Sequence, residues 1–198
     1  MQDLTNYSEK KLTIDLAKAT ANSLKIVIPI VLLFGIPYVL LHTEQFTIAN
    51  FKSTLSYLGK KYSFFLGLIP LVVMLIGIVL HELIHGLTFL PFCKNGVKSI
   101  KFGILKQYMT PYCHCKEPLK VKHYRVGVLM PAIVLGFIPA IVSIVIGDFY
   151  LLLFGMFFTQ AAVGDFMILD ILKNENKEDY VLDHPSEAGC MLYSPIQS

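Results

Sequence analysis

Charged residues are scarce in this chain of 198 residues. Asp, Glu, Lys and Arg make up 16% of the sequence, hydrophobic residues make up 55%, and the mean hydropathy is +0.61. A soluble domain usually carries about a quarter charged residues. The composition therefore excludes an ordinary water-soluble protein and predicts an integral membrane protein in contact with the lipid bilayer. The chain also lacks a nucleic-acid-binding motif and internal repeats, so no nucleic-acid partner is expected, and its length suits one domain, 1–198.

Four long stretches contain few or no charged residues. They cover residues 26–43, 62–91, 126–147 and 149–172. A helix needs roughly 20 mainly apolar residues to cross the hydrocarbon layer, so the sequence predicts four transmembrane helices. Residues 1–25 are polar and are expected to form an amphipathic helix. Because they lack a short apolar core with a small-residue cleavage site, we expect no cleaved signal peptide and a retained first span.

The lysine and arginine residues are distributed unevenly between the segments that flank these spans. The N-terminal segment, the loop 94–125 and the tail 173–198 hold 14 of them, and the other two loops hold 3. Cytoplasmic segments carry the excess of basic residues. We therefore expect both termini and the loop 94–125 to be cytoplasmic, and the basic loop favours contact with anionic lipid headgroups.

Cysteine is also sparse, and the four cysteines fall on the predicted cytoplasmic side. Thiols stay reduced there, so no structural disulfide is expected. Cys113-His114-Cys115 and Cys93 could hold a second metal ion. The Cys-x-Cys spacing is a weak signal for a zinc site, and ordinary reduced thiols are the favoured interpretation. In the tail, Asp183 and His184 are interpreted as part of a turn.

The loop between the second and third spans has a strand-like pattern. Apolar residues alternate with other residues over 98–104, which is the period of a β-strand. Residues 110–115 have the composition of a turn. The predicted fold is therefore an all-α membrane protein with four transmembrane helices and a small strand or hairpin region in this loop. The third and fourth spans are expected to form a tight helical hairpin around Gly147 and Asp148.

A His-Glu-x-x-His motif lies late in the second span, at His81, Glu82 and His85. Residues four apart on a helix share a face, so the two imidazoles can bind one zinc ion. Glu82 can reach a metal-bound water and act as its general base. Ionisable residues inside a membrane span are costly and are usually functional. The alternative interpretation is a buried polar network between helices.

A catalytic zinc site needs a third protein ligand. The candidates are Asp148, Asp165, Asp170, His114, His123 and His184. Asp165 is favoured, because the second and fourth spans run in the same direction and Asp165 lies at the depth of His85. Both residues precede the first cytoplasmic lysine by about 12–14 Å along their helices. Ala161, Ala162 and Gly164 are small residues that would let the fourth helix approach the second closely. The alternative role for Asp165 is helix capping or packing.

These features resemble a family of bacterial membrane proteins described as putative zincin peptidases. The resemblance rests on the motif at 81–86, the glycine-bearing loop, the proline-bearing third span, Gly164-Asp165 and Asp183-His184-Pro185, and it covers the chain from about residue 62 onward. The order of parts is also similar, more distantly, to the site-2 proteases. That similarity implies Zn²⁺ held by His81, His85 and Asp165, with Glu82 catalytic. It also implies a substrate-docking strand. Its expected substrate contacts are Ile100, Phe102, Gly103 and Ile104.

The chain departs from the site-2 protease pattern just before Asp165. In place of the Asn-Pro element of those enzymes it has residues 160–164, and Gln160 is the expected polar substrate contact. The predicted function is a zinc metallopeptidase of the bacterial cytoplasmic membrane. It would hydrolyse peptide bonds of a membrane or membrane-associated protein near the cytoplasmic leaflet. The alternatives are a non-catalytic metal-binding or regulatory protein, with His114 or His123 closing the metal shell, and a transporter. The sequence gives no oligomeric state.

Overall fold

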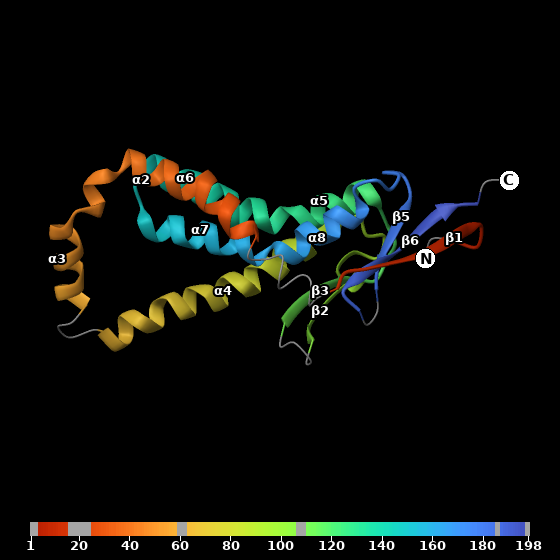
Figure 1. Ribbon diagram of the computed structural model, residues 1–198. Helices are drawn as coiled ribbons and strands as arrows, with labels where there is room; N and C mark the ends of the chain where they lie inside the picture. Colours follow the sequence, from red (N-terminus) through yellow and green to blue (C-terminus); the bar gives the residue numbers. More distant parts are fainter. Residues whose placement is uncertain (1–3, 16–24, 59–62, 106–109, 185–186, 197–198) are drawn as a thin grey trace.

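The computed structural model describes residues 4–15, 25–58, 63–105, 110–184 and 187–196. Most of these residues are helical (Figure 1). The helical segments are Lys25–Leu41, which includes the π-helix Val31–Gly35 and α2 (Ile36–Leu41), α3 (Ile48–Leu58), α4 (Ser63–Phe89), α5 (Val121–Pro131), the π-helix Ala132–Phe137, α6 (Ile138–Ile146), α7 (Phe149–Ala161) and α8 (Val163–Leu172). Short 3-10 helices cover Thr43–Phe46, Leu90–Phe92 and Gly96–Ser99. The strands are β1 (Tyr7–Thr13), β2 (Ile100–Leu105), β3 (Thr110–Cys115), β4 (Leu119–Lys120), β5 (Tyr180–Asp183) and β6 (Gly189–Pro195).

Two helices are long and apolar enough to cross a membrane, Leu68–Phe92 and Val121–Ile146. A third candidate span is α7 followed by α8, which meet at an angle of 43°. The helix Lys25–Leu41 is apolar but shorter. Large hydrophobic side chains are exposed on these helices, among them Leu40 (71% exposed), Val79 (65%) and Val145 (77%). Such surfaces suit contact with lipid rather than water.

The long helix α4 and the tight helical hairpin between α6 and α7 agree with the sequence predictions. Helix α4 ends at Phe89, and the 3-10 turn after it contains Pro91. Helix α6 ends at Gly147, whose φ of +75° is the left-handed conformation that favours glycine at a helix end. The Asp148 carboxylate then caps α7 by accepting a hydrogen bond from the backbone N–H of Leu151 at 2.9 Å.

Helix α4 diverges from α6 and α7 toward the end of the molecule that carries α3 and approaches α8 toward the sheets (Figure 1). Helix α4 crosses α7 at Gly77, where a Cβ would overlap the ring of Phe158. Helices α6 and α7 approach closely at Gly155, because a Cβ there would lie 2.5 Å from the backbone nitrogen of Ala140. Small residues at these crossings allow the helix backbones to approach.

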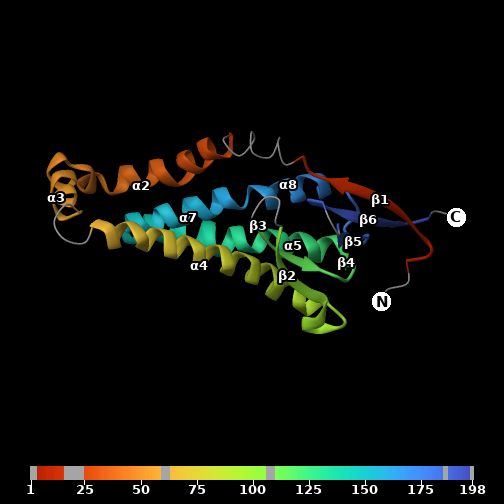
Figure 2. The same cartoon turned by 90° about the horizontal axis from the view of Figure 1, so that it is seen from below.

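The fold is not purely helical, contrary to the all-α prediction. A four-stranded antiparallel sheet has the order β1-β6-β5-β4 and joins both ends of the chain. Strand β1 replaces the helix that was expected near the N-terminus, while the neighbouring residues 16–24 lie outside the described part. The tail 173–198, for which the sequence predicts a turn at Asp183 and His184, contains β5 and β6. Because Tyr7 pairs with Pro195, the two termini lie on the same side of the molecule (Figure 2).

The strand region predicted in the loop before α5 is confirmed. Strands β2 and β3 form an antiparallel hairpin in which Phe102 pairs with Cys113. The second strand covers residues that the sequence suggested were a turn. The hairpin packs on α4 at Gly86, where a Cβ would lie 2.7 Å from Cζ of Phe102. Gly86 therefore lets the hairpin lie directly against the helix that carries the motif.

A buried core joins the hairpin, the four-stranded sheet and the ends of α4, α5 and α8. Its fully buried members come from all of these elements, and they are Phe89, Cys115, Leu119, Val121, Tyr124, Val128, Leu172, Val181, Cys190 and Leu192. This core encloses one side of the motif helix. A second, smaller cluster around Tyr38 and Leu152 packs Lys25–Leu41 against α6 and α7.

Candidate metal centre

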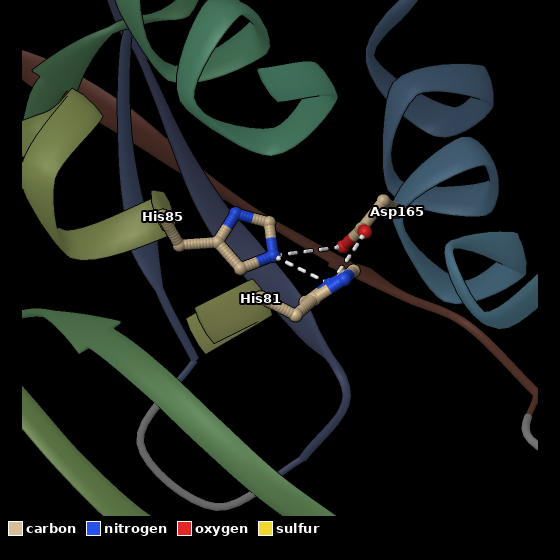
Figure 3. A group of neighbouring side chains, drawn as sticks. All are labelled: His81, His85 and Asp165. Carbon is tan, nitrogen blue, oxygen red and sulfur yellow. Dashed lines mark hydrogen bonds and ion pairs between the residues drawn. The ribbon is translucent and has the colours of Figure 1, made fainter. Parts of the chain in front are cut away.

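His81 and His85 lie one turn apart near the end of α4 and point toward α8 (Figure 3). Their Nε2 atoms are 3.2 Å apart. The side chains are largely buried, with 12% of His81 and 10% of His85 exposed. The i, i+4 spacing of the motif is what places both rings on one face of the helix.

Asp165 completes this group from α8. Its Oδ2 lies 3.1 Å from Nε2 of His81, and its Oδ1 lies 3.3 Å from Nε2 of His85. Helix α8 begins after the bend at Ala162, so Asp165 falls in its first turn. The N-terminus of a helix favours a carboxylate. The bend therefore aims Asp165 at α4 from the start of a new helix.

The small residues before Asp165 contribute differently from the sequence expectation. Ala162 is completely buried at the bend, whereas Ala161 is exposed. No atom lies within 4 Å of a Cβ built at Gly164, so Gly164 is not a point of close helix contact. Of the three positions, only Ala162 is packed where the helices converge.

The three side chains fit a zinc ion in the spacing and chemistry of their donor atoms. One ligand atom from each residue lies within 4.8 Å of the other two. Tetrahedral zinc with bonds of about 2.0–2.1 Å holds neighbouring ligand atoms about 3.3–3.5 Å apart. The Nε2 atoms are 3.2 Å apart, and the two carboxylate oxygens of Asp165 lie 3.1 Å from His81 (Oδ2) and 3.3 Å from His85 (Oδ1), at or slightly below that range. Two imidazoles and one carboxylate are also a donor set typical of catalytic zinc.

The second ring nitrogen of His85, Nδ1, is hydrogen-bonded to α5. Its Nδ1 donates a hydrogen bond to the carbonyl oxygen of Gly127 in α5 at 2.9 Å. A carbonyl only accepts, so Nδ1 carries the proton and Nε2 keeps its lone pair for a metal. Gly127 also permits close packing, because a Cβ there would overlap the ring of Phe89. The ring of Phe89 in turn stacks on His85, with centroids 6.2 Å apart and planes 11° apart.

Glu82 faces the hairpin. Its carboxylate is hydrogen-bonded by the backbone of Cys113 in β3, and it interacts electrostatically with His81, His85 and Asp165. The general-base candidate is thus partly buried between the metal-binding group and the strand edge. Because the motif helix and the hairpin pack directly together, Glu82 lies beside the backbone of β3.

The other candidate ligands lie elsewhere. Asp148 caps α7, the carboxylate of Asp170 is 2.8 Å from Nζ of Lys173, and His123 stacks on Phe92 at a centroid distance of 4.0 Å. Nδ1 of His184 accepts a hydrogen bond from the backbone of Glu187. Within the described residues, His114 and His123 do not join the His81–His85–Asp165 group, so neither closes it as the non-catalytic alternative requires.

The predicted substrate contacts lie in β2 and at the end of α7. Phe102 and Ile104 are 51% and 59% exposed, Ile100 and Gly103 are partly buried, and Gln160 is partly buried two residues before the bend.

Hydrogen-bonded and non-hydrogen-bonded residue pairs alternate along the antiparallel hairpin of β2 and β3. The N–H of Lys116 donates to the carbonyl oxygen of Ser99 at 2.8 Å, so these two residues form a hydrogen-bonded pair. The pairs of Cys115 with Ile100 and of Cys113 with Phe102 are then non-hydrogen-bonded pairs. It follows that Cys113 and Cys115 turn their N–H groups away from β2.

Comparison with known families agrees with this site. Residues 74–180 match the family model described as "Putative zincin peptidase". The chain belongs to this family. The matched region contains the His-Glu-x-x-His motif, the hairpin and Asp165, so the candidate metal ligands all lie within it. Comparisons with curated proteins and with solved structures gave no match.

The sequence did not reveal which residues support the metal-binding group. The carbonyl of Gly127 and the N–H of Cys113 act through the backbone, so their residue types carry no signal for these roles. Asp183 was interpreted as part of a turn. It is instead partly buried at the end of β5, where it accepts hydrogen bonds from the backbone N–H of Cys115 and the hydroxyl of Tyr124. The four cysteines are free thiols, and Sγ of Cys93 lies 3.5 Å from Sγ of Cys115.

Proposed function

We propose that this protein is a membrane-embedded zinc metallopeptidase that cleaves membrane or membrane-associated proteins near the cytoplasmic leaflet. The observation that carries the proposal is the convergence of His81, His85 and Asp165 from two helices, next to Glu82. Membership of the zincin peptidase family supports peptide hydrolysis as the reaction. The three ligands leave room for a fourth position, which a catalytic zinc site requires.

The chain's own residues divide the work of hydrolysis. A zinc ion held by His81, His85 and Asp165 would supply Lewis acidity, lowering the pKa of water toward ~7 and polarising the scissile carbonyl. Glu82 accepts the proton of the attacking water and passes it to the leaving amine. Gly127 keeps His85 in the tautomer that presents Nε2. The polar atoms are largely enclosed, which strengthens their electrostatic interactions.

The substrate is expected to bind in an extended conformation along the hairpin, because a helix hides its carbonyl groups. Extended peptides add to free strand edges through backbone hydrogen bonds. The outer edge of β3 faces Glu82, through the N–H of Cys113. The N–H groups of Cys113 and Cys115 on that edge already bond Glu82 and Asp183, so we assign the docking edge to the other strand of the hairpin, β2, where the side chains of Phe102 and Ile104 are exposed. Gln160 remains the candidate for a polar contact at the opposite helix.

The proposed topology has four spans in the bacterial cytoplasmic membrane, with both termini in the cytoplasm. The spans are Lys25–Leu41, α4, the helix Val121–Ile146 and the bent pair α7–α8. At 1.5 Å per residue, 17 residues extend about 25 Å, slightly less than the hydrocarbon thickness of about 30 Å. The pairing of β1 with β6 supports a common side for the termini.

Cleavage by the zinc-loaded protein tests this proposal. Wild-type protein and a Glu82→Gln variant would be reconstituted in proteoliposomes with a panel of single-span reporter proteins, and fragments would be identified by mass spectrometry. General acid–base catalysis contributes roughly 10²–10⁴-fold, so Glu82→Gln should reduce the cleavage rate by at least ~100-fold while it retains zinc.

An Asp170→Asn variant is the matched control. Asp170 lies on the same helix as Asp165 but is exposed and pairs with Lys173. We expect this variant to cleave at the wild-type rate and to bind zinc normally. Undiminished cleavage by zinc-loaded Glu82→Gln protein would show that the proposed acid–base mechanism is wrong.

A further inference from the structure

One carboxylate of the C-terminal sheet connects two elements that support the metal-binding group. Asp183 ends β5, and its Oδ2 accepts a hydrogen bond from the backbone N–H of Cys115 at 2.6 Å. Its Oδ1 accepts a hydrogen bond from the hydroxyl of Tyr124. Asp183 lies just beyond the residues that match the zincin peptidase family, which end at 180. Its two contacts lead to β3 and to α5.

The first connection runs along β3 to the general-base candidate. Cys115 and Cys113 are two residues apart in one strand, so their N–H groups point to the same edge. The N–H of Cys115 is held by Asp183, and the backbone of Cys113 hydrogen-bonds Glu82. Asp183 therefore fixes one end of the strand edge whose other contact is the Glu82 carboxylate.

The second connection runs through aromatic rings to a ligand. The ring of Tyr124 stacks on Phe89, with centroids 5.4 Å apart and planes 19° apart. Phe89 also stacks on His85, with centroids 6.2 Å apart. Tyr124 also lies one helical turn before Gly127, whose carbonyl holds the His85 imidazole. Movement of Tyr124 would therefore displace both the ring and the carbonyl that orient His85.

We propose that Asp183 is a positioning residue, which holds the β3 edge against Glu82 and the α5 face against His85. The positioning role rests on the contacts of Asp183, Tyr124 and Phe89, and only its effect on cleavage rests on the proposed function. The C-terminal sheet is thereby a part of the site's support rather than a separate appendage.

The chemistry of the two partners explains why a carboxylate is required. An N–H and a hydroxyl both present hydrogens to Asp183, and an ionised carboxylate offers two acceptor oxygens and no donor. An asparagine would offer one acceptor oxygen, and its NH₂ group would either face the N–H of Cys115 or leave the hydroxyl proton of Tyr124 without an acceptor. Replacing Tyr124 by phenylalanine removes one donor. An Asp183→Asn substitution should therefore be less disruptive in a Tyr124→Phe background.

Two readouts that need no substrate test this proposal. The first is amide hydrogen exchange in β3, and the second is zinc affinity, measured by competition with a chelator in the purified full-length protein. We expect Asp183→Asn to speed exchange at Cys113 and Cys115 at least ~10-fold. Loss of groups that orient a metal ligand typically costs 10–100-fold in affinity, and Asp183 acts through Tyr124 and Phe89, so we expect a reduction of about 10-fold.

Asp179→Asn is the matched control. Asp179 is a buried carboxylate one residue before β5, and it accepts a hydrogen bond from Ser194 at 2.5 Å within the same sheet. This substitution should disturb the sheet comparably but leave β3 exchange and zinc affinity within about 2-fold of wild type. Tyr124→Phe alone, the milder variant, should weaken zinc binding less than Asp183→Asn, and the double variant should recover part of the lost protection at β3.

Two results would overturn the positioning role. One is wild-type exchange and zinc affinity in Asp183→Asn. The other is an equal loss in Asp179→Asn, which would show a general effect of sheet stability. If Asp183→Asn does not fold, the Tyr124→Phe variant decides: wild-type zinc affinity together with wild-type β3 exchange in that variant would also overturn the positioning role. Absence of zinc binding by the wild type would instead contradict the proposed function, and the exchange measurement would still decide the role of Asp183.

Discussion

Nδ1 of His85 donates a hydrogen bond to the carbonyl oxygen of Gly127 at 2.9 Å, and this bond joins the motif helix to the third span. The same glycine leaves the space that the ring of Phe89 fills. One position thus provides both the acceptor that sets the histidine tautomer and the close helix contact that brings it within reach. The two roles make Gly127 sensitive to any added side chain.

A Gly127→Ala substitution is expected to lower both stability and zinc affinity, because its Cβ would overlap the Phe89 ring. Overpacking of this kind typically costs 1–3 kcal/mol, so we expect a loss of about 2 kcal/mol in the free energy of unfolding. Gly164→Ala is the matched control, since its Cβ meets no atom within 4 Å although it adjoins Asp165. Denaturant unfolding and chelator competition measure both effects. Equal behaviour of the two variants would refute the close-contact role.

The contact between Gly86 and Phe102 should determine how closely the hairpin approaches the motif helix. A Cβ at Gly86 would lie 2.7 Å from the Phe102 ring. We expect Gly86→Ala to push β2 and β3 away from α4 and to reduce cleavage about 10-fold without loss of zinc. Phe102→Ala should restore space, so Gly86→Ala should cost much less activity in the Phe102→Ala background than in wild type, and the two substitutions should be strongly non-additive. Additive effects in a double-mutant cycle would mean that the ring does not mediate the defect.

The carboxylate of Glu117 should make the stability of the turn after the motif helix depend on pH. Its carboxylate accepts hydrogen bonds from Ser99 and from the backbone N–H groups of Lys94 (2.8 Å) and Asn95 (3.0 Å). The bond from Ser99 is the largest of the effects that lower the pKa of Glu117 to about 2. The unfolded chain, with an ordinary pKa near 4.5, binds the proton first on acidification. The stabilisation is therefore complete above about pH 4.5 and is lost as the pH falls toward 2.

We expect a Glu117→Gln variant to be less stable than wild type at pH 7 and to lose less stability between pH 4.5 and 2. Thermal unfolding at several pH values measures both changes. A Glu44→Gln variant serves as control, because Glu44 lies in the 3-10 helix Thr43–Phe46, where its side chain is exposed 3.7 Å from His42. The same acid dependence in Glu117→Gln and in wild type would contradict the assignment.

The sequence predicted that the candidate metal ligands lie together, because their signals are local or depend on simple geometry. The spacing of His81 and His85 fixes a shared helix face. Counting residues back from Lys94 and Lys173 placed Asp165 at the depth of His85, and the structure brings the three side chains together. The strand at 98–104 was visible from its alternation. Each of these inferences needs only one element or the length of two.

The terminal sheet could not be predicted in this way. Strand β1 pairs with β6 across nearly the whole chain, and most of its residues are exposed, so it has no alternating apolar pattern. The bend at Ala162 likewise has no proline to signal it. The sequence therefore predicts one continuous span over 149–172, where α7 and α8 form a bent pair. Long-range pairing and packing decide these features, and the role of Asp183 follows from them.

The coordination of a bound zinc ion tests the central claim most directly. X-ray absorption at the zinc edge, on purified protein with measured metal content, should show one zinc per chain with nitrogen and oxygen ligands at about 2.0–2.2 Å and no sulfur. His81→Ala and Asp165→Ala should each lose most of the zinc. A sulfur-ligated zinc, or full zinc binding by the His81→Ala variant, would contradict a metal centre at His81, His85 and Asp165.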